Sequence, residues 1–221
     1  MRSEFELELR ELRGQLLAMG ARCERVVADA VASFMRRDRA MAQRVFELDQ
    51  RIDRDEMEID ELTIGVIALR QPVGEDLRFL ASTLKFVTDL ERIGDEAVNI
   101  AERARDTADD PARPVFSEIE RMGVIAREML RSSLDAFVEG DAAGARRVLA
   151  RDDEVDELYG TTLRALFAWM SSHPESIASA QAVVSVARYL ERVADHATNL
   201  AEQVVFMVEG SDVRHGRARL G

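Results

Sequence analysis

Apolar residues recur every three or four positions along almost the whole chain, which is the period of an amphipathic helix rather than of a strand. The pattern predicts six helices, at about residues 4–36, 38–71, 74–107, 117–139, 142–171 and 173–208. The connections between them are short, so consecutive helices are expected to lie side by side and antiparallel. The predicted fold class is therefore all-α.

Capping residues mark several of the predicted helix ends. A serine stands three residues before a glutamate at Ser3, Ser117 and Ser172, which is the spacing of a capping box at a helix N-terminus. Asp38 is a further N-cap candidate, and the Gln71-Pro72-Val73-Gly74 segment is typical of a helix end.

One stretch of the chain occurs twice. Residues 90–102 read LERIGDEAVNIAE, residues 190–202 read LERVADHATNLAE, and eight of the thirteen positions are identical. The preceding helices correspond as well, at an offset of 103 residues. This internal repeat predicts two tandem three-helix bundles related by a pseudo-two-fold axis, residues 1–110 and 111–221, joined through the linker 109–114.

The composition agrees with helices and excludes several classes of function. Hydrophobic residues make up 47% of the chain but aromatic residues only 5%, which favours helix over sheet. The net charge of −12 and the scattered basic residues argue against nucleic acid or an anionic membrane surface as a partner. Cys23 is the single cysteine, so no intrachain disulfide can form. Without a signal peptide or a long apolar run, the chain is expected to be cytoplasmic and not inserted in a membrane.

Each repeated stretch carries acidic residues along one helix face. Glu91 and Asp95 are four residues apart, so they fall on one side of a helix, away from its apolar stripe. The preceding helix carries a second pair with the same spacing, Asp49 and Asp53. If the two helices are neighbours, the four carboxylates can converge. Such a patch is unfavourable when empty and suits hard cations. Four acids exceed the needs of one divalent ion, which suggests a trivalent ion or a small cluster.

The second half repeats this arrangement with Asp152, Asp156, Glu191 and Asp195. A single acid pair at this spacing is a weak signal, because most such pairs are solvated and balanced by nearby arginines. The duplication at matched positions strengthens the metal hypothesis. The alternative, an ordinary acidic surface inherited twice, stays open.

A known family shares these features. They are the motif at 89–95 (DLERIGD), its copy at 190–196 (LERVADH), the Arg70-Gln71-Pro72 turn and the tail at 212–215 (DVRH). With them the chain resembles the PhoU family of phosphate-uptake regulators over essentially its whole length. The resemblance implies two three-helix bundles with multinuclear metal sites, which are iron or zinc clusters in family members. Mn, Mg and Ca are further ions that carboxylates accept.

The resemblance implies that the acidic residues of the two motifs are the metal ligands. They are Asp49, Asp53, Glu91 and Asp95 in the first half and Asp152, Asp156, Glu191 and Asp195 in the second. The amides of Asn99 and Asn199 are expected to add oxygen ligands. The halves differ at several matched positions, Asp89 and Tyr189, Gly94 and Ala194, and Glu96 and His196. The helix of Asp152 and Asp156 also lacks the further acids, Glu56 and Asp60, that continue the line of Asp49 and Asp53. The second site is therefore expected to be weaker or to hold another metal.

The resemblance also implies a regulator rather than an enzyme. The family acts as a cytoplasmic adaptor that restrains phosphate uptake and phosphate-starvation signalling, with the phosphate ABC transporter and a phosphate-sensing histidine kinase as partners. Apolar surface left over by two bundles suggests a homodimer. Two alternatives stay open: a helical interaction module without functional metal, and a ferritin-like carboxylate metalloenzyme, which is disfavoured because no Glu-x-x-His motif occurs.

Overall fold

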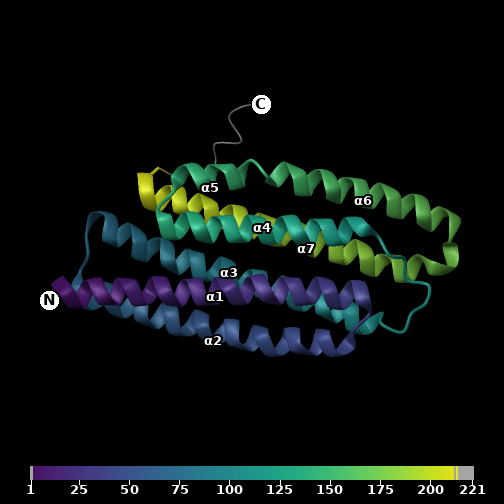
Figure 1. Cartoon of the computed structure of the whole chain (residues 1–221), viewed down its shortest axis with the longest axis horizontal. Coiled ribbons are helices and arrows are strands. Elements are labelled where there is room, and N and C mark those ends of the chain that lie inside the picture. The colour runs from purple at the N-terminus through teal and green to yellow at the C-terminus, as the bar shows by residue number, and fades with distance from the viewer. Residues whose placement is uncertain (1, 212, 214–221) are drawn as a thin grey trace.

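The computed structural model describes residues 2–211 and 213. Its helices are α1 (Arg2–Arg36), α2 (Arg39–Arg70), α3 (Gly74–Asp106), α4 (Ser117–Glu139), α5 (Ala142–Leu149), α6 (Asp152–Ser172), the 3₁₀ helix η1 (Pro174–Ser176) and α7 (Ile177–Glu209), shown in Figure 1. This part of the chain contains no strand, so the all-α prediction is confirmed. None of these helices is both long and apolar enough to cross a membrane. Apart from Val213, the tail motif at 212–215 lies outside the described residues.

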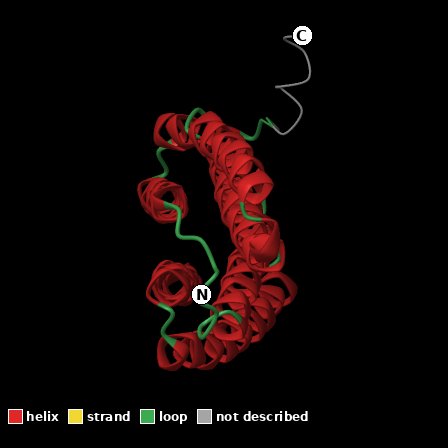
Figure 2. Ribbon diagram, turned by 90° about the vertical axis from the view of Figure 1, so that its right-hand side faces the viewer, coloured by secondary structure: helices red, strands yellow, loops and turns green. Residues whose placement is uncertain are grey.

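The helices form two bundles that lie side by side, and the helices of both run along the long axis of the molecule (Figure 1). Helices α1, α2 and α3 pack on one another, and α7 packs on α4, α5 and α6 in the second bundle. Two interfaces join the bundles, α3 against α7 and α1 against α4. Figure 2 shows the bundles almost end-on, one above the other. The predicted tandem bundles are confirmed.

The hydrophobic core is continuous across both bundles. Phe137 of α4 contacts two rings of α3, with centroid distances of 5.7 Å to Phe79 and 4.7 Å to Phe86. Close backbone packing supports the other interface, because a Cβ atom on Gly20 of α1 would stand 2.5 Å from the Leu134 side chain of α4. The two repeats therefore share one core, and the division at residue 110 remains a prediction.

The connection between α3 and α4 is fastened to both bundles. The buried guanidinium of Arg113 lies 4.0 Å from the Phe34 ring centroid and donates to the Phe34 carbonyl at 2.6 Å. Arg37 donates to the carbonyls of Asp110 and Arg113. The Asp110 carboxylate in turn accepts a hydrogen bond from Ser179 of α7. Burial lowers the pKa of Arg113 to about 10, which leaves the guanidinium charged at neutral pH.

Two of the predicted helix ends are confirmed. Asp38 caps α2, because its carboxylate accepts a hydrogen bond from the Met41 N–H at 2.9 Å. The same helix ends at Gln71, which adopts the left-handed conformation (φ 47°) and donates its N–H to the Ile67 carbonyl. Pro72 follows at once and cannot continue the helix.

The three predicted capping boxes are wrong. Helix α1 begins at Arg2, before Ser3, and α4 begins at Ser117 itself without a side-chain cap. Ser172 ends α6 instead of opening the next helix, and its hydroxyl donates to the Trp169 carbonyl one turn back at 3.0 Å. Serine hydroxyls bond equally well to carbonyls of a preceding turn, so the spacing alone does not decide which end they occupy.

The helix predicted at 142–171 is also wrong, because it is divided into α5 and α6. The α-helical hydrogen bonding is interrupted at Ala150 and Arg151. There the Arg151 N–H donates to the carbonyl of Val148, three residues back, at 2.9 Å. Helix α6 restarts with three acidic residues, 152–154, in its first turn. Carboxylates there interact favourably with the positive end of the helix dipole, so this acidic run favours a new helix start.

Substitution of Phe137 by alanine should destabilise both bundles together. Removing a buried phenylalanine side chain costs about 3–5 kcal/mol, and this ring contacts the other repeat. We expect a single urea-unfolding transition at lower urea, reported equally by circular dichroism and by fluorescence of Trp169. The matched control is Phe167→Ala, since that ring is 58% exposed and its loss should change stability by no more than about 0.5 kcal/mol. Two separate transitions in Phe137→Ala would contradict the shared core.

Candidate metal site

The four predicted carboxylates of the first half lie together where α2 packs against α3. Partial burial raises the pKa of Asp49 to about 7, and the charges of Asp53, Asp95 and Glu91 add to the shift. A neighbouring charge has such an effect only over a short distance. The convergence expected from the i, i+4 spacing is therefore present.

Asp49 reaches deepest into the contact between the two helices. Its Oδ1 atom is buried and has no hydrogen-bond partner. That oxygen lies over the backbone of α3 at Gly94, where a Cβ atom would stand only 2.6 Å away. A buried carboxylate oxygen without a partner is costly, so this position lacks a donor or a cation.

Glu91 also has a buried carboxylate oxygen that accepts no hydrogen bond. Its Oε2 atom is buried without a hydrogen bond, and partial burial followed by the charge of Asp95 raises its pKa. Arg92 supplies some positive charge, with nitrogen–oxygen distances of 3.4 Å to Glu91 and 3.2 Å to Asp95. Because the Arg92 side chain is 57% exposed, its ion pairs are screened by water and balance the cluster only in part.

A fifth carboxylate extends the first cluster along α2. Glu56 follows Asp53 by three residues, and partial burial, Asp60 and Asp53 raise its pKa. Asp95 of α3 contributes to the same shift, which places Glu56 at the edge of the four predicted ligands. The signal for it was the continuation of the acidic line along the same helix face.

The four predicted residues of the second half also lie together. Partial desolvation raises the pKa of Asp195, and the charges of Asp152 and Asp156 add to it. The pKa of Glu191 is raised by burial and then by Asp195 and Asp156. Asp152 is buried at the first position of α6, so the break in the predicted helix positions this carboxylate. Where the first half has a glycine, Ala194 adds a buried methyl group.

Neither cluster is arranged as a finished coordination sphere. Among the residues that the structure describes, no three Asp, Glu, His or Cys side chains are placed to hold one ion. The amide nitrogen of Asn99 donates to Glu96 at 3.2 Å, and that of Asn199 donates to Asp89 at 3.0 Å. The role of these amides as oxygen ligands remains a prediction.

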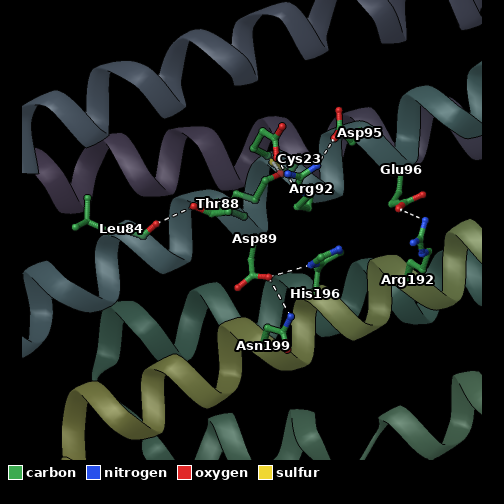
Figure 3. A network of polar contacts seen from close by, with 12 residues as sticks. Cys23, Leu84, Thr88, Asp89, Arg92, Asp95, Glu96, Arg192, His196 and Asn199 are labelled. Carbon is green, nitrogen blue, oxygen red and sulfur yellow. Dashed lines mark hydrogen bonds and ion pairs between the residues drawn. The ribbon is translucent and has the colours of Figure 1, made fainter. Parts of the chain in front are cut away.

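Sequence reasoning missed a set of polar contacts in the seam between α3 and α7 (Figure 3). Asp89 Oδ1 lies 2.9 Å from His196 Nδ1 and accepts a hydrogen bond from Asn199. Arg192 donates to Glu96 at 2.9 Å. In each contact α3 supplies the carboxylate and α7 supplies the nitrogen.

These seam contacts fall at positions where the two repeats differ. Position 189 is Tyr where the first repeat has Asp89, and His196 corresponds to Glu96. Near a pseudo-two-fold axis, identical repeats would bring two carboxylates together at this point, and like charges repel. Positions at which the two otherwise similar repeats differ could therefore have predicted the polar contacts between α3 and α7.

Comparison with known proteins identifies the family. The family model described as "PhoU domain" matches residues 16–104 and 119–204. The PhoU homologue of Pseudomonas putida is 43% identical over 213 residues, which covers 96% of this chain and 83% of the relative. The homologue of Caulobacter vibrioides is 40% identical and covers 96% of this chain and 93% of its own length. Both are named phosphate-specific transport system accessory proteins.

Solved structures agree with this assignment. The crystal structure of PhoU from Pseudomonas aeruginosa superposes with a TM-score of 0.90 at 40% identity, over 94% of this chain and all of that chain. The phosphate transport system regulatory protein PhoU from Streptococcus pneumoniae gives a TM-score of 0.88 at 27% identity, over 95% and 99% of the two chains. The fold is thus that of a tandem-bundle regulatory protein. The chain belongs to the PhoU family, as its repeated motif predicted.

Substitution of Asp89 by asparagine should weaken the seam. The side chain is 17% exposed and carries two charge-assisted contacts, so its neutralisation should lower the free energy of unfolding by about 1–3 kcal/mol. The measurement is urea unfolding at neutral pH with chelator present. Asp106→Asn is the control, because its carboxylate is 45% exposed and surface ion pairs contribute no more than about 1 kcal/mol. Equal losses in the two variants would contradict the role of the seam.

The Asp49 carboxyl should make stability fall as the pH rises. Well below pH 3.8 the Asp49 carboxyl is protonated in both the folded and the unfolded state, so it has no effect on stability. Between pH 4 and 7 the unfolded chain, with an ordinary pKa of 3.8, releases its proton first, which favours unfolding; above pH 7 the full cost is present. Asp49→Asn should therefore stabilise the metal-free protein at pH 8 by about 1–4 kcal/mol and leave its stability nearly unchanged at pH 3. Urea unfolding at both pH values tests this, and a destabilised variant at pH 8 would refute it.

Proposed function

We propose that this chain is a metal-binding negative regulator of phosphate uptake and phosphate-starvation signalling. In this proposal it is a cytoplasmic adaptor between the phosphate ABC transporter and a sensor histidine kinase. Family membership supports the phosphate role, since its relatives are named accessory proteins of the phosphate-specific transport system. A name as an accessory or regulatory protein also agrees with a role that is not catalytic.

The observation that carries the metal part is a pair of buried oxygens without a hydrogen bond, Asp49 Oδ1 and Glu91 Oε2, within a cluster of like charges. Glu91 Oε2 has only the ion pair with the exposed Arg92 at 3.4 Å. Bound cations would compensate the burial and the like-charge repulsion that together raise the pKa values of Asp49 and Glu91. All donors are carboxylates, which bind hard divalent ions and iron and also accept zinc. The chemistry of the donor set therefore fits an iron or zinc cluster.

The residues proposed to hold the ions come from two helices in each bundle. They are Asp49, Asp53, Glu91 and Asp95 in the first half and Asp152, Asp156, Glu191 and Asp195 in the second. A bound ion would neutralise the cluster and tie α2 to α3 or α6 to α7. This links metal content to the rigidity of the surface that the bundles present to a partner.

We also propose that the chain works as a homodimer, because large apolar side chains remain exposed. At the α2–α3 end, Leu69 is 80% and Val73 is 79% exposed.

The alternative function is a helical interaction module in which metal plays no part. The absence of a finished coordination sphere among the described residues favours that alternative, so metal content decides between the two.

The paired substitution Glu91→Gln with Asp95→Asn should abolish metal binding at the first site. Both changes keep the side-chain size and remove the charge that attracts a cation. We expect protein purified without chelator to contain metal, and the variant to lose the share held by the first cluster at unchanged helicity. The matched control is Glu102→Gln with Asp106→Asn, an acid pair of the same spacing on the same helix beside Arg103. Metal content that stays equal in all three proteins would contradict the assignment.

A genetic test addresses the regulatory part. In the organism that encodes the chain, deletion of the gene should switch on a phosphate-starvation reporter in phosphate-rich medium, and the intact gene should silence it again. The metal-site variant should fail to silence the reporter while its matched control succeeds. A reporter that stays off after deletion would count against the regulatory proposal.

A further inference from the structure

Gly94 stands in the middle of a long buried helix, where glycine is an unfavourable choice. It lies in α3, which runs from Gly74 to Asp106, and it is buried. Glycine in a helix interior is less stable than alanine, because it loses more backbone freedom on folding. The matched helix of the second repeat has Ala194 at this position, so the helix geometry itself does not require glycine. A reason for Gly94 must therefore lie in what packs against it.

What packs against Gly94 is the carboxylate of Asp49. A Cβ atom at position 94 would stand 2.6 Å from Asp49 Oδ1, which is closer than any real contact of this kind. The next neighbours, two carbon atoms of Ile52, would be 3.4 Å away and could adapt. The backbone of α3 therefore carries no side chain at Gly94, where the Asp49 carboxylate of α2 packs against it.

We propose that Gly94 is a positioning residue for the metal site, in that its missing side chain seats Asp49 against α3 beside Glu91 and Asp95. This inference rests on the proposed function, because it assigns a role toward the metal bound there. A methyl group at position 94 would force the Asp49 carboxylate away from α3 while leaving the apolar core intact. The second cluster has Ala194 at the matched position, so the proposal concerns the first cluster alone.

The test is the substitution Gly94→Ala in the full chain. Groups that orient metal ligands typically account for about 10- to 100-fold in metal affinity, and we expect a loss of that size at the first site. The melting temperature of the metal-free protein should stay the same or rise, because alanine favours the helix. Metal affinity would thus fall without any loss of stability, which damage to the fold would not produce.

Binding is measured with Zn²⁺ alone and with Mn²⁺ alone, by competition with a chromophoric chelator. A background of Glu191→Gln with Asp195→Asn, checked by circular dichroism, confines the signal to the first cluster. Gly65→Ala is the matched control. Gly65 lies within α2, and a methyl group at this position would have no neighbouring atom within 4 Å. This change therefore brings the same backbone gain and should leave affinity unaltered.

The outcomes separate the inference from the function on which it rests. If Gly94→Ala weakens binding and Gly65→Ala does not, the positioning role is supported. If the parent protein binds neither ion, the proposed metal function fails and the inference fails with it. If the parent binds an ion and Gly94→Ala binds it equally well, or if Gly94→Ala lowers the melting temperature together with the affinity, the inference alone is overturned.

Discussion

The packing of α3 on α7 is the constraint on which the rest of the structure depends. Each of these two helices is the element against which the other helices of its own bundle pack, and each also faces its counterpart in the other bundle. Their apolar faces are buried almost completely, from Phe86 to Ile100 in α3 and from Val186 to Ala201 in α7. Because each helix is buried both in its own bundle and against the other bundle, its rotation about its axis is fixed. The face of the repeated stretch (90–102 and 190–202) that lies outside the core is therefore fixed as well.

This fixed rotation explains why acidic residues gather in unfavourable places. Because Leu90 and Ile93 are buried in the core, Glu91 lies beside α2. There it is close to the carboxylates of Asp49 and Asp53. Partial desolvation, followed by the repulsion between like charges, raises the pKa values of Asp49 and Glu91 and opposes folding. This cost to stability is the physical basis of the proposal that the cluster binds a cation, because proteins retain such strain where it serves a function.

The seam shows how a duplicated chain avoids conflict at its own symmetry axis. Two identical helices that face each other across the axis would bring the acidic residues of the motif together. Asp89 meets His196 and Asn199, and Glu96 meets Arg192, so each carboxylate finds a nitrogen partner. The departures from repeat symmetry at positions 189 and 196 make this pairing possible. Loss of symmetry in the sequence thus produces complementarity in the structure.

The sequence by itself determined the helical fold class, the duplication and the family, but not the break between α5 and α6. Helix periodicity, the Asp38 cap and the turn at Gln71-Pro72 are local properties, and an internal repeat is visible in the order of residues alone. Local signals that allow two readings were less secure, as Ser172 shows, because a hydroxyl can bond either forward or backward along the chain. Only the tertiary structure decided that Asp49 rests on Gly94, that Asp89 reaches His196 and that the two cores merge. These contacts depend on the relative rotation and shift of helices far apart in the chain, which are set by the packing of the whole core rather than by any short segment of sequence.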